Sequence, residues 1–350
     1  MLQNRLRSVI FDYINAKYAM PHKIALVAIE NCLSSAITGS IDLFTAANMI
    51  ARLRNQAKHP IFEWIVVSED GEPVKTFSGY QQEVDQSWDT LGEIDLIVIP
   101  GIALGDVDLL MDVIFANRSL IDWLKMQAKK ETLIAGNCSG NFFMAEADLL
   151  NGHPATTTWW ITDFLSERYP EILVQPDAIL TASDQFICSG TAMSCLDMGI
   201  YLIERLAGQS MAKLTARYML VDVNRNSQAP YRLPVPQNQQ DRFILKARRT
   251  VRRNLHNDIS VKGLAEKMNV SSRTLIRKFT QQTGQTPLAF IQNQRIEAGK
   301  ELLEDSDLPL DEIVSRIGYQ DSSSFRRLFK RETGLSPREY RKQFTINPVS

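Results

Sequence analysis

Short, mainly apolar runs alternate with amphipathic stretches through the first half of the chain. The stretches 41–53 and 107–126 carry apolar side chains at helical spacing. Runs with the length of buried strands lie around them at 24–29, 61–67, 94–101 and 132–135. Strands that are apolar on both faces belong to parallel sheets covered by helices. The pattern therefore predicts a doubly wound α/β domain with a parallel sheet.

A second pattern occurs twice in the last ninety residues. Leu275 and Phe279 lie four apart on one face of a predicted helix, and Phe325 and Phe329 repeat this spacing fifty residues later. Upstream of each pair, apolar residues at helical spacing predict another, shorter helix. Each copy is thus a helix, a tight turn and a second helix. The two copies predict an all-α domain with two helix-turn-helix units.

Polar residues and glycine mark the ends of these predicted helices. In the first unit, Ser260 caps the first helix and either Ser271 or Ser272 caps the second. In the second unit, Gly318 ends the first helix by adopting a positive φ, and Asp321 or Ser322 caps the second. Several side chains on the second helices then face outward and are candidates for contact with DNA. They are Arg273, Thr274, Arg277, Ser322, Ser323, Arg326 and Arg327.

One long helix is predicted between the two units. Pro287 suits a first helical turn, and the helical pattern continues from there to Glu304. At 1.5 Å per residue this helix is a rod of roughly 27 Å. Such a rod suits two reading helices in successive major-groove faces of one duplex, which lie about 34 Å apart.

Charge separates the two regions of the chain. From residue 241 to the end there are 21 lysines and arginines against 13 aspartates and glutamates, whereas residues 1–240 contain 18 against 27. A chain with a formal net charge of −1 therefore joins an acidic region to a basic one, as expected when only one end meets phosphate. For one unit taken alone, a helical bundle with a solvated charged face remains the alternative.

An ordered set of short motifs runs through residues 259–344. It includes Ser271-Ser-Arg-Thr-Leu275, Thr283-Gly-Gln-Thr-Pro287, Arg295-Ile-Glu-Ala298, Ile317-Gly-Tyr319, Ser322-Ser-Ser-Phe325 and Gly334-Leu-Ser-Pro-Arg338. This region resembles the DNA-binding domain of AraC/XylS-type transcription regulators. The resemblance implies double-stranded promoter DNA and RNA polymerase as partners. Gly299 stands where this family usually has Ala, which predicts a linker helix softened by up to ~1 kcal/mol.

Composition limits the remaining possibilities. Four cysteines without CxxC spacing indicate a reduced cytoplasmic protein, and the four scattered histidines predict no metal site. No apolar run approaches the ~18 residues that span a bilayer, so we expect no membrane contact and no cofactor is indicated. We expect an N-terminal extension at 1–19, the α/β domain at 20–221, a linker rich in Pro, Asn and Gln at 222–241, and the DNA-binding domain at 242–350.

One turn of the α/β domain is chemically suggestive. The sequence Ala135-Gly-Asn-Cys-Ser-Gly140 takes a strand directly into a helix that begins at Asn141. This arrangement predicts that Cys138 lies on a sharp elbow, where backbone N–H groups and the helix N-terminus lower the pKa of its thiol. The alternative is that Cys138 only occupies a tight turn.

Around this elbow, residues 23–208 carry Ile99-Pro-Gly101, Cys138-Ser-Gly140, Ala155-Thr-Thr157, Trp159 and Asp197. They resemble the class I glutamine-amidotransferase-like (PfpI-type) domains that are fused to AraC-type domains. Family members with a catalytic pair have His at the position of Thr158. Thr accepts no proton near pH 7, so Cys138 lacks a base and the chain is expected not to be an enzyme.

A pocket is expected at the carboxyl ends of the parallel strands. Its candidate walls are Glu30, Gly101, Cys138, Ser139 and Trp159. A carboxylate beside Trp159 and Trp160 suits a cationic or amine-bearing metabolite by cation–π attraction, although adjacent tryptophans are as often ordinary packing. The resemblance implies a small-molecule effector of the same kind, an amino acid or an amine.

The two regions together predict a sequence-specific transcription regulator whose α/β domain senses a small metabolite and controls promoter binding or activation. The resemblance adds a homodimer formed through the α/β domain. One alternative is a Cys138-dependent amidase or peptidase with a helical DNA-binding tail, which needs a base that position 158 does not supply. Another is a structural DNA-binding protein, for which a complete α/β domain is superfluous.

Overall fold

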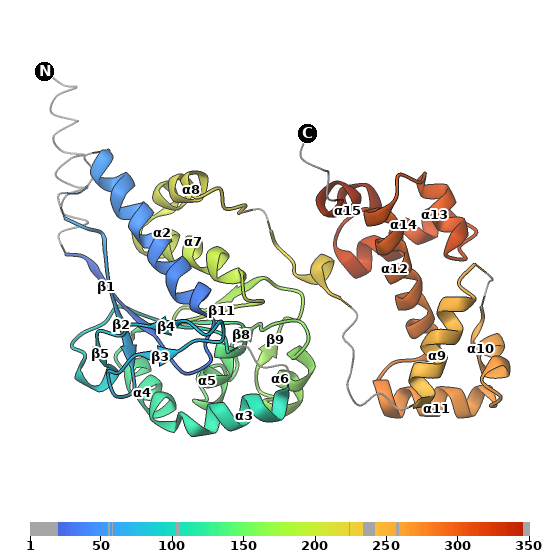
Figure 1. The fold of residues 1–350 in the computed structure, drawn as a ribbon, viewed down its shortest axis with the longest axis horizontal. Helices are drawn as coiled ribbons and strands as arrows, with labels where there is room; N and C mark the ends of the chain where they lie inside the picture. Colours follow the sequence, from blue (N-terminus) through green and yellow to red (C-terminus); the bar gives the residue numbers. More distant parts are fainter. Residues whose placement is uncertain are drawn as a thin grey trace, which may run out of the picture. The chain divides into compact units, whose positions relative to one another are not determined.

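The computed structural model describes residues 20–345 apart from 55, 56, 58, 103–105, 224, 234–241, 257 and 258. These residues form two compact units, and the division falls between Gln228 and Ala229 (Figure 1). The predicted extension at 1–19 and residues 234–241 of the predicted linker lie outside the described residues.

A seven-stranded sheet forms the centre of the first unit, in the order β10-β11-β7-β6-β1-β2-β5. The strands are β1 (His22–Val27), β2 (Phe62–Ser68), β5 (Gln86–Ser87), β6 (Leu96–Ile99), β7 (Leu133–Asn137), β10 (Leu180–Ala182) and β11 (Phe186–Ser189). All neighbours pair in parallel except β10, which is antiparallel to β11. The predicted parallel sheet is therefore confirmed.

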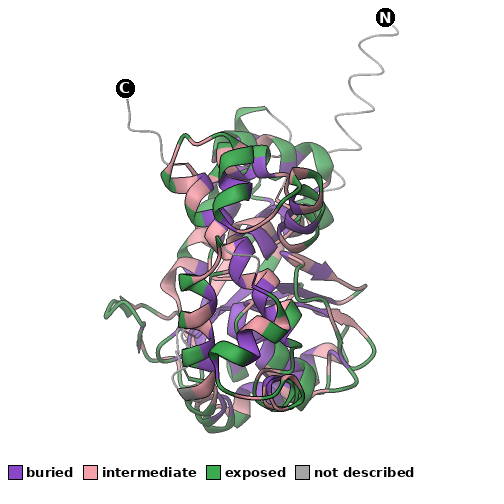
Figure 2. Ribbon diagram, turned by 90° about the vertical axis from the view of Figure 1, so that its right-hand side faces the viewer, coloured by how far each residue is buried: buried purple, intermediate pink, exposed green. Residues whose placement is uncertain are grey.

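Helices cover both faces of this sheet (Figure 1). Helices α2 (Ser34–Leu53), α7 (Ser194–Ala207) and α8 (Gln209–Tyr218) pack against one another on one face. Helices α3 (Val107–Ala116), α4 (Arg118–Ala128) and α5 (Asn141–Glu146) lie on the other. Between the layers, the strands are buried along most of their length, which explains their continuous apolar runs (Figure 2).

Small elements complete the first unit. They are the pair β3 (Val74–Lys75) and β4 (Gln81–Gln82), the pair β8 (Pro154–Ala155) and β9 (Leu173–Val174), helix α6 (Thr162–Arg168), and the 3-10 turns η1 (Trp88–Thr90) and η2 (Cys138–Gly140). The stretch 107–126 is helical as predicted, but it is divided into two helices. Asn117 ends α3, with its side-chain amide donating to the carbonyl of Val113 at 2.8 Å.

The second unit is all-α within the described residues. After the 3-10 turn η3 (Ala229–Tyr231), it contains α9 (Arg242–Arg253), α10 (Val261–Lys267), α11 (Ser272–Thr283), α12 (Pro287–Asp305), α13 (Leu310–Arg316), α14 (Ser322–Thr333) and α15 (Pro337–Phe344). Two separate apolar cores form, one around Leu275 and Phe279 and the other around Phe325 and Phe329. Helix α12 contributes Phe290 and Ile291 to the first core and Ile296 and Leu303 to the second. The two predicted helical units and the rod between them are thus confirmed.

Candidate nucleic-acid interface and ligand pocket

Helices α11 and α14 hold equivalent places in their units, and each begins at a side-chain cap. Ser271 accepts a hydrogen bond from the backbone N–H of Thr274 at 3.1 Å. Asp321 accepts from the N–H groups of Ser323 and Ser324 at 3.0 and 2.8 Å. The hydrogen bonds to its carboxylate lower the pKa of Asp321 to about 2. This cap therefore stays ionised throughout the physiological range.

The buried face of each helix leaves a basic face in solvent. Leu275 and Phe279 are fully buried in α11, whereas Arg273 and Arg277 are exposed. In α14, Phe325 and Phe329 are buried, and Ser323, Arg326 and Arg327 are exposed. These five predicted contact residues therefore lie together on two outward surfaces, where a duplex can reach them.

The other two predicted contact residues are half-buried and have partners in the caps. The Thr274 hydroxyl lies 2.9 Å from the Ser271 hydroxyl, and the Ser322 hydroxyl donates to Asp311 of α13 at 2.5 Å. Their hydroxyls position the start of each helix, so they are less available to bases than the exposed arginines are. We keep both as candidates for contact with phosphate.

Ile276 is a surface residue that the sequence interpretation did not select. Its side chain is 46% exposed in the middle of the outward face of α11, between Arg273 and Arg277 in sequence. A large apolar side chain on a basic reading surface suits the methyl group of thymine. The repeat could have identified Ile276 as a contact residue, because it occupies the place in α11 that Arg326 takes in α14.

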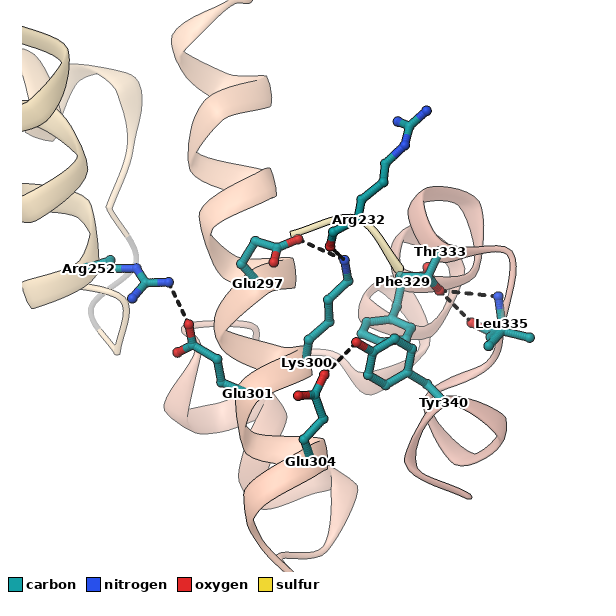
Figure 3. A network of polar contacts seen from close by, with 10 residues as sticks. All are labelled: Arg232, Arg252, Glu297, Lys300, Glu301, Glu304, Phe329, Thr333, Leu335 and Tyr340. Atoms are coloured by element: carbon teal, nitrogen blue, oxygen red, sulfur yellow. Dashed lines mark hydrogen bonds and ion pairs between the residues drawn. The ribbon is translucent and has the colours of Figure 1, made fainter. Parts of the chain in front are cut away.

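Polar side chains along α12 tie the rod to both halves of the second unit (Figure 3). Glu301 pairs with Arg252 of α9 at 2.7 Å, and Glu304 accepts a hydrogen bond from the Tyr340 hydroxyl of α15 at 2.6 Å. Burial, together with this bond to Glu304, raises the pKa of Tyr340, so the phenol remains the donor. The spacing of α11 and α14 is therefore fixed by packing along the rod and by polar contacts near its C-terminal end.

Gly318 also joins the two halves. Its φ is +78°, as predicted for the end of α13, and a Cβ at this position would collide with the carbonyl oxygen of Leu255. The lack of a side chain at Gly299 has a different structural reason. A Cβ there would lie 3.1 Å from the ring of Phe325, so the missing methyl makes room for the core of the second helix-turn-helix unit.

In the first unit, Cys138 lies on the predicted elbow after β7. Its φ of +56° is in the left-handed region, which a non-glycine residue rarely adopts. The elbow packs closely on the loop after β6, because a Cβ on Gly101 would lie 2.8 Å from the Cβ of Cys138. The Ser139 hydroxyl donates to the carbonyl of Ile102 and accepts from its N–H, both at 2.7 Å. The strained turn is thus held by its neighbours.

The thiol of Cys138 is not activated. Burial raises its pKa to about 11, although contacts with Ser139 and Thr158 partly offset this effect. The predicted lowering by the helix N-terminus is therefore wrong, since α5 is only six residues long and desolvation of the thiolate dominates. No histidine lines the cavity beside Cys138 among the described residues. His153 instead packs edge-on against Phe186, with the ring centres 5.3 Å apart.

A cavity of about 360 Å³ opens beside the elbow, within the range of small-molecule sites. Leu33, Ile102, Cys138 and Ala192, which follow β1, β6, β7 and β11, contribute to its wall. The cavity therefore lies at the carboxyl ends of parallel strands, as predicted for this fold.

The lining of this cavity is mainly apolar, with a few polar groups. Phe77 and Trp160 supply aromatic surface, and both rings are partly exposed. Asp106 supplies a carboxylate at the start of α3. The hydroxyl of Thr158 is buried in the wall and has no hydrogen-bond partner of normal geometry among the described residues. A ligand with an apolar body and one polar or cationic group matches these features.

Of the five predicted pocket residues, Cys138 and Ser139 line the cavity and Gly101 lies directly beneath Cys138. Glu30 lies outside the lining, because its carboxylate accepts a hydrogen bond from the backbone N–H of Lys75 in β3 at 3.0 Å. Trp159 also lies outside it and packs edge-on against Trp160, which takes the place in the wall. No described group of His, Cys, Asp and Glu side chains could hold a metal ion.

Comparison with known protein families matches each unit separately. A DJ-1/PfpI family model matches residues 38–194, and a model named helix-turn-helix domain matches residues 264–343. The chain joins a DJ-1/PfpI domain to an AraC-type helix-turn-helix domain. The cavity beside Cys138 belongs to the DJ-1/PfpI domain, and α11 and α14 belong to the AraC-type domain.

Known relatives share this combination over most of the chain. The HTH-type transcriptional regulator GbdR of Pseudomonas aeruginosa is 22% identical over 329 residues, which cover 92% of this chain and 84% of the relative. The HTH-type transcriptional regulator CdhR of the same species is 25% identical over 300 residues, 85% of this chain and 87% of the relative. A proposed transcriptional regulator from Vibrio parahaemolyticus has a similar fold, with a TM-score of 0.50 and 18% identity over 57% of this chain and all of that chain.

Proposed function

We propose that this protein is a transcription regulator that binds operator DNA through α11 and α14 and binds a small effector in the cavity beside Cys138. The observation that carries the proposal is the pair of equivalent helices with exposed basic faces, held at a fixed spacing by α12. This unit is joined to a domain with a cavity of ligand size. Relatives named as transcriptional regulators align across both domains, which supports the same role.

The effector class follows from the wall of the cavity. Aromatic rings at Phe77 and Trp160, with the carboxylate of Asp106, favour a small molecule that carries an amine or another cationic group. The buried hydroxyl of Thr158, which has no partner of normal geometry among the described residues, offers one further hydrogen bond. Anionic ligands are disfavoured because no lysine or arginine lines the cavity among the described residues.

The DNA-binding part of the proposal is tested by selection of sites from a randomised duplex library with the full-length protein. We expect a bipartite site with two motifs about one helical turn apart and a steep loss of affinity with salt, because lysines and arginines displace counterions from phosphate. Binding that ignores sequence and retains no bipartite pattern would contradict it.

The effector part is tested by thermal unfolding of the full-length protein with tetramethylammonium, which offers only a cation and methyl groups. The control is 2,2-dimethyl-1-propanol, which carries a tert-butyl group but no charge. A ligand at a hundredfold excess over Kd stabilises the folded state by about 2.7 kcal/mol, so we expect a shift in Tm with the cation only. The substitution Trp160→Ala should remove that shift. A shift that survives in this variant would place the ligand elsewhere.

A catalytic role is not proposed. Cys138 has a raised thiol pKa, and the described lining of its cavity offers neither histidine nor another base positioned to take its proton.

A homodimer formed through the DJ-1/PfpI domain and a contact with RNA polymerase complete the proposal. Light scattering on the purified protein tests the first, with about twice the 39.7 kDa chain mass expected.

A further inference from the structure

Gln228 is buried at a place where the sequence predicts a linker. Its side chain is only 1% exposed, and its amide group donates to the carbonyls of Thr157 and Pro176, both at 2.9 Å. Its backbone N–H donates to the carbonyl of Asp177 at 2.8 Å. The preceding residues are also held, since Arg225 pairs with Asp197 of α7 at 2.6 Å. Residues 225–228 therefore form part of the DJ-1/PfpI domain.

Gln228 binds Thr157, and Thr157 in turn binds Cys138, which lines the cavity. The hydroxyl of Thr157 donates to the carbonyl of Cys138 at 2.8 Å, and the carbonyl that Gln228 binds belongs to the peptide that leads into Thr158. Cys138 and Thr158 both line the cavity, and the buried hydroxyl of Thr158 has no hydrogen-bond partner of normal geometry among the described residues. A ligand that engages Thr158 therefore acts on the same peptide that Gln228 binds through its carbonyl.

The residues that follow Gln228 are anchored in the DNA-binding unit. Turn η3 (Ala229–Tyr231) lies against α14, the Tyr231 hydroxyl accepts a hydrogen bond from Gln343 of α15 at 2.6 Å, and its ring packs edge-on against Phe344. The carbonyl of Arg232 accepts from Lys300 of α12 at 3.3 Å (Figure 3). Gln228 and Tyr231 are thus only three positions apart, and each is fixed in a different unit.

The geometry points to Thr157 and Gln228 as a relay that carries the state of the cavity to the strap formed by residues 229–232, and through the strap to α14 and α15. This inference rests on the proposed function, because a relay regulates DNA binding only if the cavity takes an effector. Both residues are positioning residues, since neither lines the cavity nor lies on the outward face of α11 or α14. The ion pair of Arg225 with Asp197 and the contacts of Gln228 fix the residues that precede the strap.

The test is hydrogen–deuterium exchange of the full-length protein without ligand, followed in peptides that cover 136–142, 225–233 and 337–344. Thr157→Val removes the hydroxyl bond to Cys138 and keeps the side-chain shape. Gln228→Met removes the amide and keeps the chain length. We expect each variant to speed exchange in both 136–142 and 225–233 by between about twofold and tenfold, the range that one lost buried hydrogen bond produces. A smaller rise is expected in 337–344.

Gln185→Met is the matched control. Its amide also donates to two carbonyls of the same domain, those of Ala128 and Thr132 at 2.7 and 3.0 Å, but it does not contact the strap. It should leave 225–233 unchanged. Gly190→Ala provides an independent variant, because its Cβ would lie 3.0 Å from the side-chain oxygen of Gln228 and displace that side chain without removing it. It should reproduce the effect of Gln228→Met even if the latter folds poorly.

The relay is wrong if Thr157→Val speeds exchange in 136–142 while 225–233 matches the control, or if Gly190→Ala leaves both segments at the wild-type rate. Because no ligand is added, this result is separate from the proposed function. Failure of tetramethylammonium to shift the Tm would remove the proposed effector class, whereas the exchange data would still decide whether cavity wall and strap are coupled.

Discussion

Thr158 lies beside Cys138 in the wall of one cavity, in the place where a base would have to stand for the thiol to become a nucleophile. The cysteine is on a strained elbow of the kind that presents nucleophiles, yet its neighbour accepts no proton near pH 7 and burial raises the thiol pKa to about 11. The elbow therefore shapes the wall of the cavity and supplies no activated group. The backbone of the elbow keeps the shape that presents a nucleophile, but among the described residues the thiol lacks the base that would activate it.

We predict that Cys138 reacts slowly with iodoacetamide at pH 7 in the folded protein. Only the thiolate reacts, and a pKa of about 11 leaves a very small thiolate fraction at that pH. The rate should rise about tenfold per pH unit up to the limit of folding. Mass spectrometry of the peptide that contains Cys138 measures it, and protein unfolded in urea is the reference. A rate at pH 7 in the folded state that equals the unfolded rate would contradict the burial argument.

Alkaline pH should destabilise the fold through its buried thiols. Burial raises the pKa of Cys138 and Cys195 to about 11 and that of Cys188 to about 12, from an ordinary value of 9.0. Below pH 9 both folded and unfolded thiols keep their protons. From pH 9 to about 11 the unfolded thiols ionise and the folded ones do not, so the free energy of unfolding falls by about 1.4 kcal/mol per pH unit for each thiol.

Urea unfolding at pH 8, 9 and 10 checks this prediction, with Cys188→Ala as the comparison. The variant loses stability at every pH because of the smaller side chain, but it should show a shallower fall above pH 9 than the wild type does. Parallel curves for the two proteins would show that Cys188 ionises alike in both states.

We predict that Arg273 and Ile276 read bases. Arg273→Ala should cost about 1–3 kcal/mol on the preferred site and relax the preference at one position. Ile276→Ala should reduce preference for thymine at a neighbouring position, because its exposed side chain matches the thymine methyl group. Binding across a randomised library measures both. Arg316→Ala, which removes an exposed arginine paired with Glu312 on α13, should leave the profile unchanged.

Arg327 should contribute through phosphate. Its guanidinium donates to Ser324 of the same helix at 3.3 Å, and the residue lines a groove together with Tyr319 and Arg331. Arg327→Ala should weaken binding evenly across sequences and reduce the slope of log K against log salt by about one. A reshaped sequence profile would instead make α14 the primary reader. Phe329→Ala separates folding from binding, since it should cost about 3–5 kcal/mol of stability.

Gly318 and Gly284 give a matched pair for stability. Both have a positive φ, +78° and +66°, but a Cβ on Gly284 meets nothing within 4 Å whereas one on Gly318 meets the carbonyl of Leu255. Gly284→Ala should cost about 1–2 kcal/mol for the left-handed backbone alone. Gly318→Ala should cost clearly more, because the two halves of the DNA-binding unit must separate there. If urea unfolding showed equal losses of stability in the two variants, the backbone at Leu255 would have to move away from the new methyl group at little cost in free energy.

Local signals in the sequence were sufficient for the DNA-binding unit. The caps at Ser260, Ser271 and Asp321 and the positive φ of Gly318 depend on neighbouring residues, and the repeat made each unit a check on the other. Helix α9 was not predicted, since its many arginines obscure the buried stripe of Ile244, Ala247 and Val251. The sequence likewise showed one apolar stretch at 107–126, where the cap formed by Asn117 divides two helices.

The cavity beside Cys138 was only partly predictable. The elbow at Cys138 follows from adjacent residues, but which of Trp159 and Trp160 faces the cavity depends on the turn that places them. Glu30 was selected because it follows a strand, and its bond to Lys75 is a contact between segments that are far apart in sequence. Gln228 lay in a stretch that composition marks as a linker, and only the tertiary structure reveals that its side chain is buried.

The nineteen residues of α12 reach from one apolar core to the other without a break, so the distance between the two reading surfaces is a property of the folded chain. The operator has to match it. One base pair added between the two motifs would turn the second by about 34° around the duplex axis and move it out of reach of its helix. Promoters under this protein should therefore tolerate changes in the bases between the motifs far better than changes in their number.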